Sequence, residues 1–121
     1  MLKKDINWLF LLIENLFLGI AKMEIVLKLR EVLNKYSEDL KKLWVEHIYL
    51  FGSYATGNFN EESDIDLLIE WNEAKFSWDI YGIFYDIQQH FDKPLDIGFV
   101  SSLRKEIKRD IEEKNNLITV F

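Results

Sequence analysis

The sequence contains no cysteine and a single proline, and what it lacks narrows what the protein can be. Without cysteine, neither a disulfide nor a thiolate zinc site can form, which agrees with the cytoplasmic location that we expect. The net charge of -6 leaves no excess of basic residues, and this argues against broad nucleic-acid binding. With 121 residues, 49% of them hydrophobic, the chain is long enough for one domain with a core.

The first 22 residues lack a small-x-small cleavage site, and their apolar run from Ile6 to Ile20 is short for a membrane span. Glu14 and Asn15 interrupt that run, but its hydrophobic content predicts a helix rather than disorder. Three interpretations stay open. The segment packs on the domain or on a partner, lies on a membrane surface, or precedes a natural start at Met23. We expect no membrane attachment, and we divide the chain into an extension, 1–22, and a domain, 23–121.

The domain alternates between helical and strand patterns. Apolar residues at helical spacing predict helices over 24–43, 75–91 and 103–114. Short apolar runs predict strands over 48–51, 64–71, 95–100 and 117–121. The second strand is apolar on both faces, so we expect it to be central and covered on both sides. The order predicts an α+β fold: a small mixed sheet of about four strands, with helices packed on one face and an extra N-terminal helix.

The sequence also indicates a helix cap and a cluster of aromatic residues. Ser101-Ser102 and Glu106 predict a capped start for the last helix. Four aromatic residues do not all fit the apolar stripe of the 75–91 helix: Trp71, Trp78, Tyr81 and Tyr85. Such a cluster indicates either a protein interface or a surface that the 1–22 helix covers.

The stretch from Leu50 to Glu70 carries the chemistry. If 64–69 is a strand, Asp64 and Asp66 point to the same side, where two carboxylates repel each other unless a cation lies between them. Mg²⁺ prefers such oxygen ligands together with substrate phosphates. Gly52-Ser53 leaves the preceding strand in a small-residue turn, whose N–H groups suit those phosphates. Ser63 either bonds the local backbone, which is the more common role, or contacts a phosphate.

Asp96 lies in the next apolar strand, LDIGFV. A carboxylate there is unfavourable to bury unless it is paired or bound to a metal. It is either an exposed residue of an edge strand or the third member of the acidic cluster. The nearby Asp64 and Asp66 make us favour the cluster.

Gly52-Ser53, ten further residues, Asp64-x-Asp66 and then Asp96 resemble the polymerase beta type nucleotidyltransferase superfamily, and in particular its minimal nucleotidyltransferase (MNT) branch. The resemblance covers about 23–121 and implies a palm-like sheet. It implies that Asp64, Asp66 and Asp96 are catalytic and bind two Mg²⁺ ions with ATP. It further implies that Gly52 and Ser53 hold the triphosphate, with Ser63 beside them, and that Asp96 activates the acceptor hydroxyl through its metal or as a base.

The chain differs from the family at one motif position, since Thr56 replaces a frequent arginine. It also has no room for the second substrate-binding domain of larger relatives, so the acceptor belongs to another molecule. MNT proteins that it resembles act as antitoxins that transfer AMP to a tyrosine of a HEPN-domain ribonuclease toxin. We therefore expect a hetero-oligomer with such a toxin. The alternatives are a non-catalytic antitoxin that covers its partner, nucleotidyl transfer to a small molecule with a partner subunit, and a domain whose acidic cluster only binds metal.

Overall fold

The computed structural model describes residues 2–114 and 117–121, and the side chains of 7–109, 111 and 117–121. A long helix and a short helix come first in the chain, and four strands separated by helices and turns follow. The elements are α1 (Leu2–Lys35), α2 (Ser37–Lys42), β1 (Val45–Phe51), α3 (Ser53–Thr56), β2 (Ile65–Trp71), a 3₁₀ turn at Glu73–Lys75, α4 (Asp79–Gln88), β3 (Leu95–Phe99), a 3₁₀ turn at Val100–Ser102, α5 (Lys105–Lys114) and β4 (Ile118–Thr119).

The four strands form one sheet in the order β3-β2-β1-β4. β1 is antiparallel to β2 and β4, whereas β2 and β3 are parallel, so the sheet is mixed. β2 is an inner strand, in agreement with its apolar residues on both faces. The predicted α+β class with a small mixed sheet is thereby confirmed.

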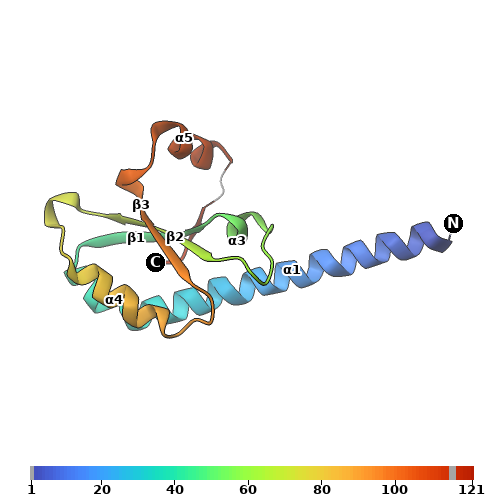
Figure 1. Cartoon of the computed structure of the whole chain (residues 1–121), viewed down its shortest axis with the longest axis horizontal. Helices are drawn as coiled ribbons and strands as arrows, with labels where there is room; N and C mark the ends of the chain where they lie inside the picture. Colours follow the sequence, from blue (N-terminus) through green and yellow to red (C-terminus); the bar gives the residue numbers. More distant parts are fainter. Residues whose placement is uncertain (1, 115–116) are drawn as a thin grey trace.

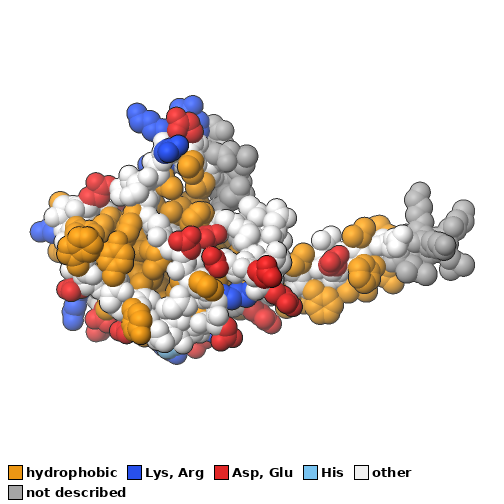
Figure 2. All heavy atoms as spheres, viewed as in Figure 1, with side chains coloured by type: hydrophobic (Ala, Val, Ile, Leu, Met, Phe, Trp, Pro, Cys, Tyr) orange, Lys and Arg blue, Asp and Glu red, His pale blue; other side chains and the backbone are white. Residues whose placement is uncertain are grey.

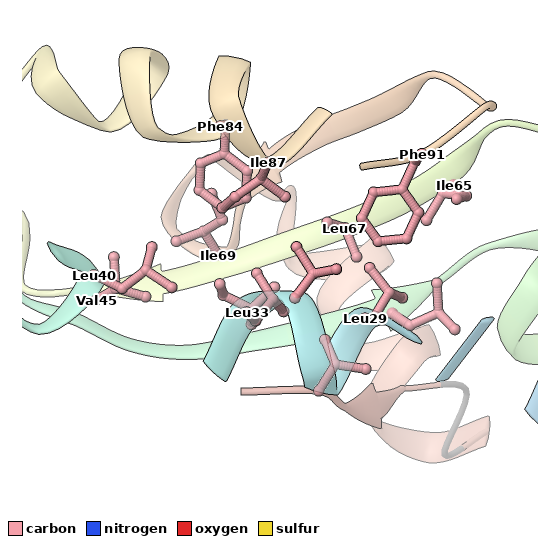
Figure 3. Packing of buried hydrophobic residues seen from close by; sticks show 14 of the residues in the cluster. Leu29, Leu33, Leu40, Val45, Ile65, Leu67, Ile69, Phe84, Ile87 and Phe91 are labelled. Carbon is pink, nitrogen blue, oxygen red and sulfur yellow. The ribbon is translucent and has the colours of Figure 1, made fainter. Parts of the chain in front are cut away.

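The main core lies between one face of the sheet and the helices α1, α2 and α4 (Figure 3). Ile65, Leu67 and Ile69 alternate along β2 and point to this side, where α1 contributes Leu29 and Leu33. All five side chains are at most 1% exposed. Burial of this size stabilises the fold by about 1.5–3 kcal/mol for each large apolar side chain.

Helices lie on both sides of the sheet, which differs from the one-sided arrangement that we predicted. α5 is on the side away from α1 and α4 (Figure 1), where Ile111 lines a cavity together with Leu68 of β2. Leu68 is fully buried on this second face. An apolar residue there needs cover, and α5 with the preceding 3₁₀ turn supplies it.

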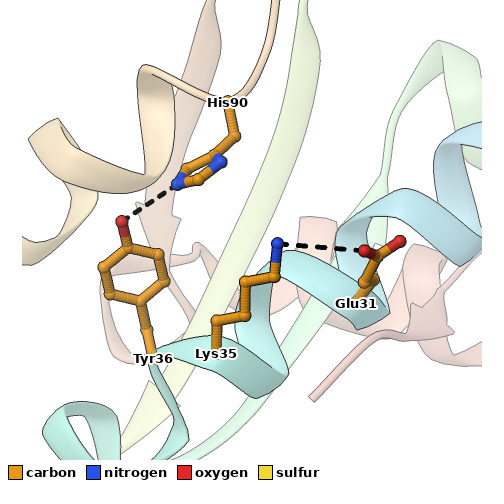
Figure 4. Close-up of polar contacts among 4 residues, drawn as sticks. All are labelled: Glu31, Lys35, Tyr36 and His90. Carbon is orange, nitrogen blue, oxygen red and sulfur yellow. Dashed lines mark hydrogen bonds and ion pairs between the residues drawn. The ribbon is translucent and has the colours of Figure 1, made fainter.

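α1 is continuous through residue 22 and projects beyond the domain toward the N-terminus (Figure 1). The helix predicted over 24–43 is therefore the second part of a longer one. It ends at Lys35, and α2 follows after Tyr36. The Tyr36 hydroxyl lies 3.0 Å from His90 Nε2 and so joins the end of α1 to the end of α4 (Figure 4). The neighbouring ion pair of Glu31 and Lys35 is exposed and adds little stability.

Two other helix predictions were wrong in detail. α4 begins only at Asp79, so Phe76, which lies within the predicted 75–91 helix, precedes α4 and is 42% exposed. Ser101-Ser102 lies in a 3₁₀ turn, and α5 begins at Lys105, so these serines do not cap it. In both places a 3₁₀ turn follows the strand, and the α-helix begins only after this turn.

The aromatic side chains beside α4 stay open to solvent. Trp78 is 75% exposed and Tyr85 69%, so the described part of α1 does not cover them. Trp71 is half-buried and stacks on Phe99 at a centroid distance of 4.8 Å.

Within the described residues, no helix combines the length and the apolarity that crossing a membrane requires.

Candidate active site

The turn after β1 depends on Gly52. Its φ of 71° and ψ of -148° are open to glycine and strained for other residues. A Cβ at this position would also collide with the carboxylate of Asp66, which lies opposite Phe51 in the antiparallel pairing of β1 and β2. Gly52 therefore lets the backbone of the turn approach the Asp66 carboxylate directly.

Ser53 opens the four-residue helix α3, which ends at Gly57 in the left-handed conformation. The Ser53 carbonyl accepts hydrogen bonds from the Gly57 N–H at 3.0 Å and from the Thr56 hydroxyl at 3.2 Å. Thr56 itself is exposed and turns its hydroxyl back onto this helix.

Asp66 and Asp96 are brought together by the sheet. They are direct partners in the parallel pairing of β2 and β3. Asp66 alternates with Leu68 and Glu70, on the face away from the main core. Asp96 is exposed and lies on an edge strand, as one of the two interpretations holds, and it is also the direct strand neighbour of Asp66. Its place in a cluster of three carboxylates stays a prediction. Asp64 lies exposed immediately before β2 rather than inside it.

The other two carboxylates act on that of Asp66. Partial burial raises the pKa of Asp66, and the negative charges of Asp96 and Asp64 raise the pKa further. Both effects disfavour the charged form of a carboxylate. Figure 2 shows acidic side chains (red) near the centre of the domain in this view.

Asp64, Asp66 and Asp96 suit a hard divalent cation, because each side chain would offer carboxylate oxygens as metal ligands. Among the described residues, however, no three His, Cys, Asp or Glu side chains already stand close enough to hold a metal ion. Asp66 and Asp96 would be the first ligands, and Asp64 would join them by a movement of its exposed side chain. A bound cation would lower the raised pKa of Asp66, because it favours the charged form.

Ser63 belongs to the loop before β2. Its hydroxyl accepts a hydrogen bond from the Asn60 N–H at 2.9 Å, and its own N–H donates to the Asn60 carbonyl at 3.1 Å. This is the local backbone role that we considered more common. Contact of Ser63 with a nucleotide stays a prediction.

Two lysines that the sequence analysis did not single out hold this region in place. Lys22 Nζ of α1 donates to the Ala55 carbonyl at 2.9 Å, at the end of α3. Lys93 Nζ donates to the Glu61 carbonyl at 2.7 Å and lies 5.7 Å from the centroid of the Tyr54 ring. No local signal marks either lysine, because each contact joins segments more than 30 residues apart.

A cavity of about 340 Å³ lies farther along the same face of β2. It is lined by Tyr49, Leu68, Glu70, Val100, Leu103, Lys108, Ile111 and Leu117. The Tyr49 hydroxyl donates to Glu70 Oε2 at 2.7 Å. Burial and this carboxylate raise the pKa of Tyr49 to about 12. Since residues 66, 68 and 70 share a face, the cavity continues the surface that carries the carboxylates.

Comparison with known proteins identifies the family to which this chain belongs. Residues 33–118 match the model of the family described as "Nucleotidyltransferase domain". A relative from Methanocaldococcus jannaschii, named "Putative protein adenylyltransferase", is 33% identical over 97 residues, which cover 75% of this chain and 95% of the relative.

Two solved structures share the fold. The first is a toxin-antitoxin with AMP-PNP, with a TM-score of 0.54 and 20% identity. The second is a mutant of the toxin-antitoxin MntA-HpeT, with a TM-score of 0.53 and 18% identity. Each match covers 73% of this chain and 71% of the solved chain.

Proposed function

Because the chain belongs to the nucleotidyltransferase domain family, we propose that it transfers AMP from ATP to a tyrosine of a partner HEPN-domain toxin, with Mg²⁺ as cofactor. The nucleotidyltransferase class is established by the family, as the sequence predicted. The observation that carries the proposal is the pairing of Asp66 with Asp96 directly beside Gly52. This juxtaposition supplies two carboxylates and a close backbone turn at one point.

The transfer forms a bond between the acceptor oxygen and the α-phosphorus of ATP and breaks the bond from that phosphorus to the pyrophosphate oxygen. Mg²⁺, when bound, supplies positive charge to the attacking and leaving oxygens. Asp64, Asp66 and Asp96 would hold two such ions, and Gly52 and Ser53 would hold the triphosphate. Asp96, the exposed member of the strand pair, is open to an incoming hydroxyl and would orient it or accept its proton.

A protein acceptor is supported by the relative named for protein adenylyltransfer and by the two toxin-antitoxin structures of the same fold. The division at residue 22, the cytoplasmic location and the HEPN class of the partner belong to this proposal as expectations.

The direct test incubates the protein with ATP labelled on the α-phosphate, Mg²⁺ and a purified HEPN-domain toxin encoded beside it. We expect label on a toxin tyrosine, located by mass spectrometry. Asp66→Asn and Asp96→Asn should each lower the rate on the order of a hundredfold or more, because the charge that organises the phosphates is lost. Asp92→Asn is the matched control, an exposed aspartate four residues before Asp96, and should leave the rate unchanged.

The outcomes separate the alternatives. Neutralisation of the toxin that survives Asp66→Asn without any label would favour an antitoxin that acts by covering its partner. Label on a small molecule in the presence of the partner would favour the small-molecule acceptor. Failure to bind ATP in the presence of Mg²⁺ would contradict every catalytic form of the proposal.

A further inference from the structure

A regular apolar seam begins in the projecting part of α1 and continues to Leu27, beside the domain. Large apolar residues recur along it at alternating steps of four and three: Leu9, Ile13, Leu16, Ile20, Met23 and Leu27. This is the 3.5-residue period of a coiled coil. In heptad notation Ile13, Ile20 and Leu27 occupy position a, and Leu9, Leu16 and Met23 occupy position d. We call these six residues the heptad seam.

The heptad seam is open to solvent over its whole length. Its side chains are between 43% and 64% exposed. Figure 2 shows hydrophobic side chains (orange) along the part of α1 that leaves the domain. The seam spans 19 residues, or about 28 Å of helix. A continuous exposed apolar strip of this length is unfavourable in water and marks an interaction surface.

The seam and the buried face of α1 lie on different sides of the helix. Val26, Leu29 and Leu33 face the sheet and are buried, whereas Met23 and Leu27 are exposed. At 100° per residue, the centre of the seam is about a third of a turn away from the centre of this buried stripe. Met23 and Leu27 border a cavity that Ile118 of β4 also lines, so the part of the seam that is clear of the domain runs from Leu9 to Ile20.

We propose that α1 pairs through the heptad seam with α1 of a second copy of this chain, in parallel and in register. Two features select this occupant. The seam has isoleucine at two a positions and leucine at two d positions, the combination that favours parallel two-stranded coiled coils. No charged residue occupies a or d between residues 9 and 27, so identical residues can face each other without repulsion. Phe10 and Phe17, at position e, flank the seam and extend the buried area.

The first test measures the mass of the full chain in solution by sedimentation or light scattering. We expect a species of two chains. The double variant Leu16→Glu/Ile20→Glu should weaken this association on the order of a hundredfold or more, because it places four carboxylates in the seam of the pair.

Trp8→Glu/Leu11→Glu is the matched control. It introduces the same charges at two exposed apolar residues of the same helix that lie outside the seam. The control should keep the two-chain mass. Equal loss in both variants would indicate unspecific association and overturn the proposal. A monomer, a larger assembly, or a chain that gains mass only with the toxin or with lipid vesicles would overturn it too.

The second test determines the orientation. Because the chain has no cysteine, Leu9→Cys and Met23→Cys each introduce a single reporter at opposite ends of the seam. In a parallel pair each variant cross-links with itself under mild oxidation. In an antiparallel pair neither does so efficiently, and cross-links form mainly when the two variants are mixed. The second pattern would overturn the parallel arrangement.

Discussion

One half of α1 packs on the sheet and the other half projects beyond the domain. Both halves contain many apolar residues, but the domain covers only those of the packed half. In the half that packs on the sheet, Leu29 and Leu33 have no exposed surface, whereas Phe17 in the projecting half is 67% exposed. Both halves belong to one uninterrupted helix. Helix formation is therefore decided locally, by residues with good helical spacing, but burial is decided by what lies alongside. The first half needs a partner that the domain does not provide.

The largest expected difference between the halves is in stability. Leu33→Ala should lower the free energy of unfolding by about 2–5 kcal/mol, because it leaves a cavity in the core. Leu11→Ala, in the projecting half and outside the heptad seam, should change it by less than about 0.5 kcal/mol. Denaturant unfolding monitored by circular dichroism measures both. Similar losses for the two variants would mean that the projecting half is packed within the monomer.

Two glycines sharpen the same comparison. Gly52→Ala should reduce transferase activity strongly and destabilise the fold by about 1–3 kcal/mol, because the alanine would be strained at positive φ and would displace the Asp66 carboxylate. Gly19 lies in the projecting half with open space around it. Gly19→Ala should stabilise α1 by about 0.5–1 kcal/mol. Thermal unfolding and the labelling assay together check these opposite effects. A fully active Gly52→Ala protein would contradict the close approach.

Lys22 connects α1 to α3. It lies where the packed half of α1 begins, and its ammonium group donates a hydrogen bond to the backbone at the end of α3. Lys22→Met keeps the aliphatic chain and removes the donor, so it should cost about 1 kcal/mol of stability. Hydrogen exchange of residues 53–57 should become faster in this variant. Lys28→Met serves as control, because it removes an exposed α1 lysine whose ammonium group lies over the Phe91 ring instead of bonding the α3 backbone. Unchanged exchange in Lys22→Met would show that α3 stands without this contact.

The smallest expected effect concerns pH. The folded pKa of Asp66 is raised, so the folded protein holds this proton more tightly than the unfolded chain does. The resulting stabilisation is present below the ordinary aspartate pKa of about 3.9 and is lost as the pH rises through the higher folded pKa. Metal-free Asp66→Asn should therefore be more stable than the parent at neutral pH, and the difference should vanish in acid.

Unfolding at several pH values in a chelator measures this difference. Glu14→Gln, at an exposed position in the projecting half, should show no such dependence. A variant Asp66→Asn that is less stable than the parent at neutral pH would contradict the crowding of carboxylates.

Much of the fold followed from local patterns. The strand over 64–71 was predicted to within one residue, because a short run that is apolar on both faces is typical of a central strand. The ends of helices were less predictable. The apolar pattern over 24–43 continues through Tyr36, but the helix is interrupted at this residue. The Tyr36 hydroxyl instead forms a hydrogen bond with His90, just after α4. A contact across 54 residues leaves no trace in a helical periodicity.

The candidate site shows the same division. Gly52, Asp66 and Asp96 could be selected from spacing and residue type, since glycine and paired carboxylates in a strand context have few other uses. That Asp66 faces Asp96, that Asp64 stays just outside the strand, and that Lys22 and Lys93 brace the neighbouring segments depended on strand register and packing.

The strands, the Gly52-Ser53 to Asp66 stretch and the heptad seam can be read from the amino-acid sequence, because each is a periodicity or spacing within about 20 residues. Which side of α1 the domain occupies, and that Asp96 meets Asp66, depend on the folded structure, because distant segments must pack together. The residue types of the nucleotidyltransferase motif are thus visible in the sequence. Their assembly into one site depends on folding, and so does the exposure of the first half of α1.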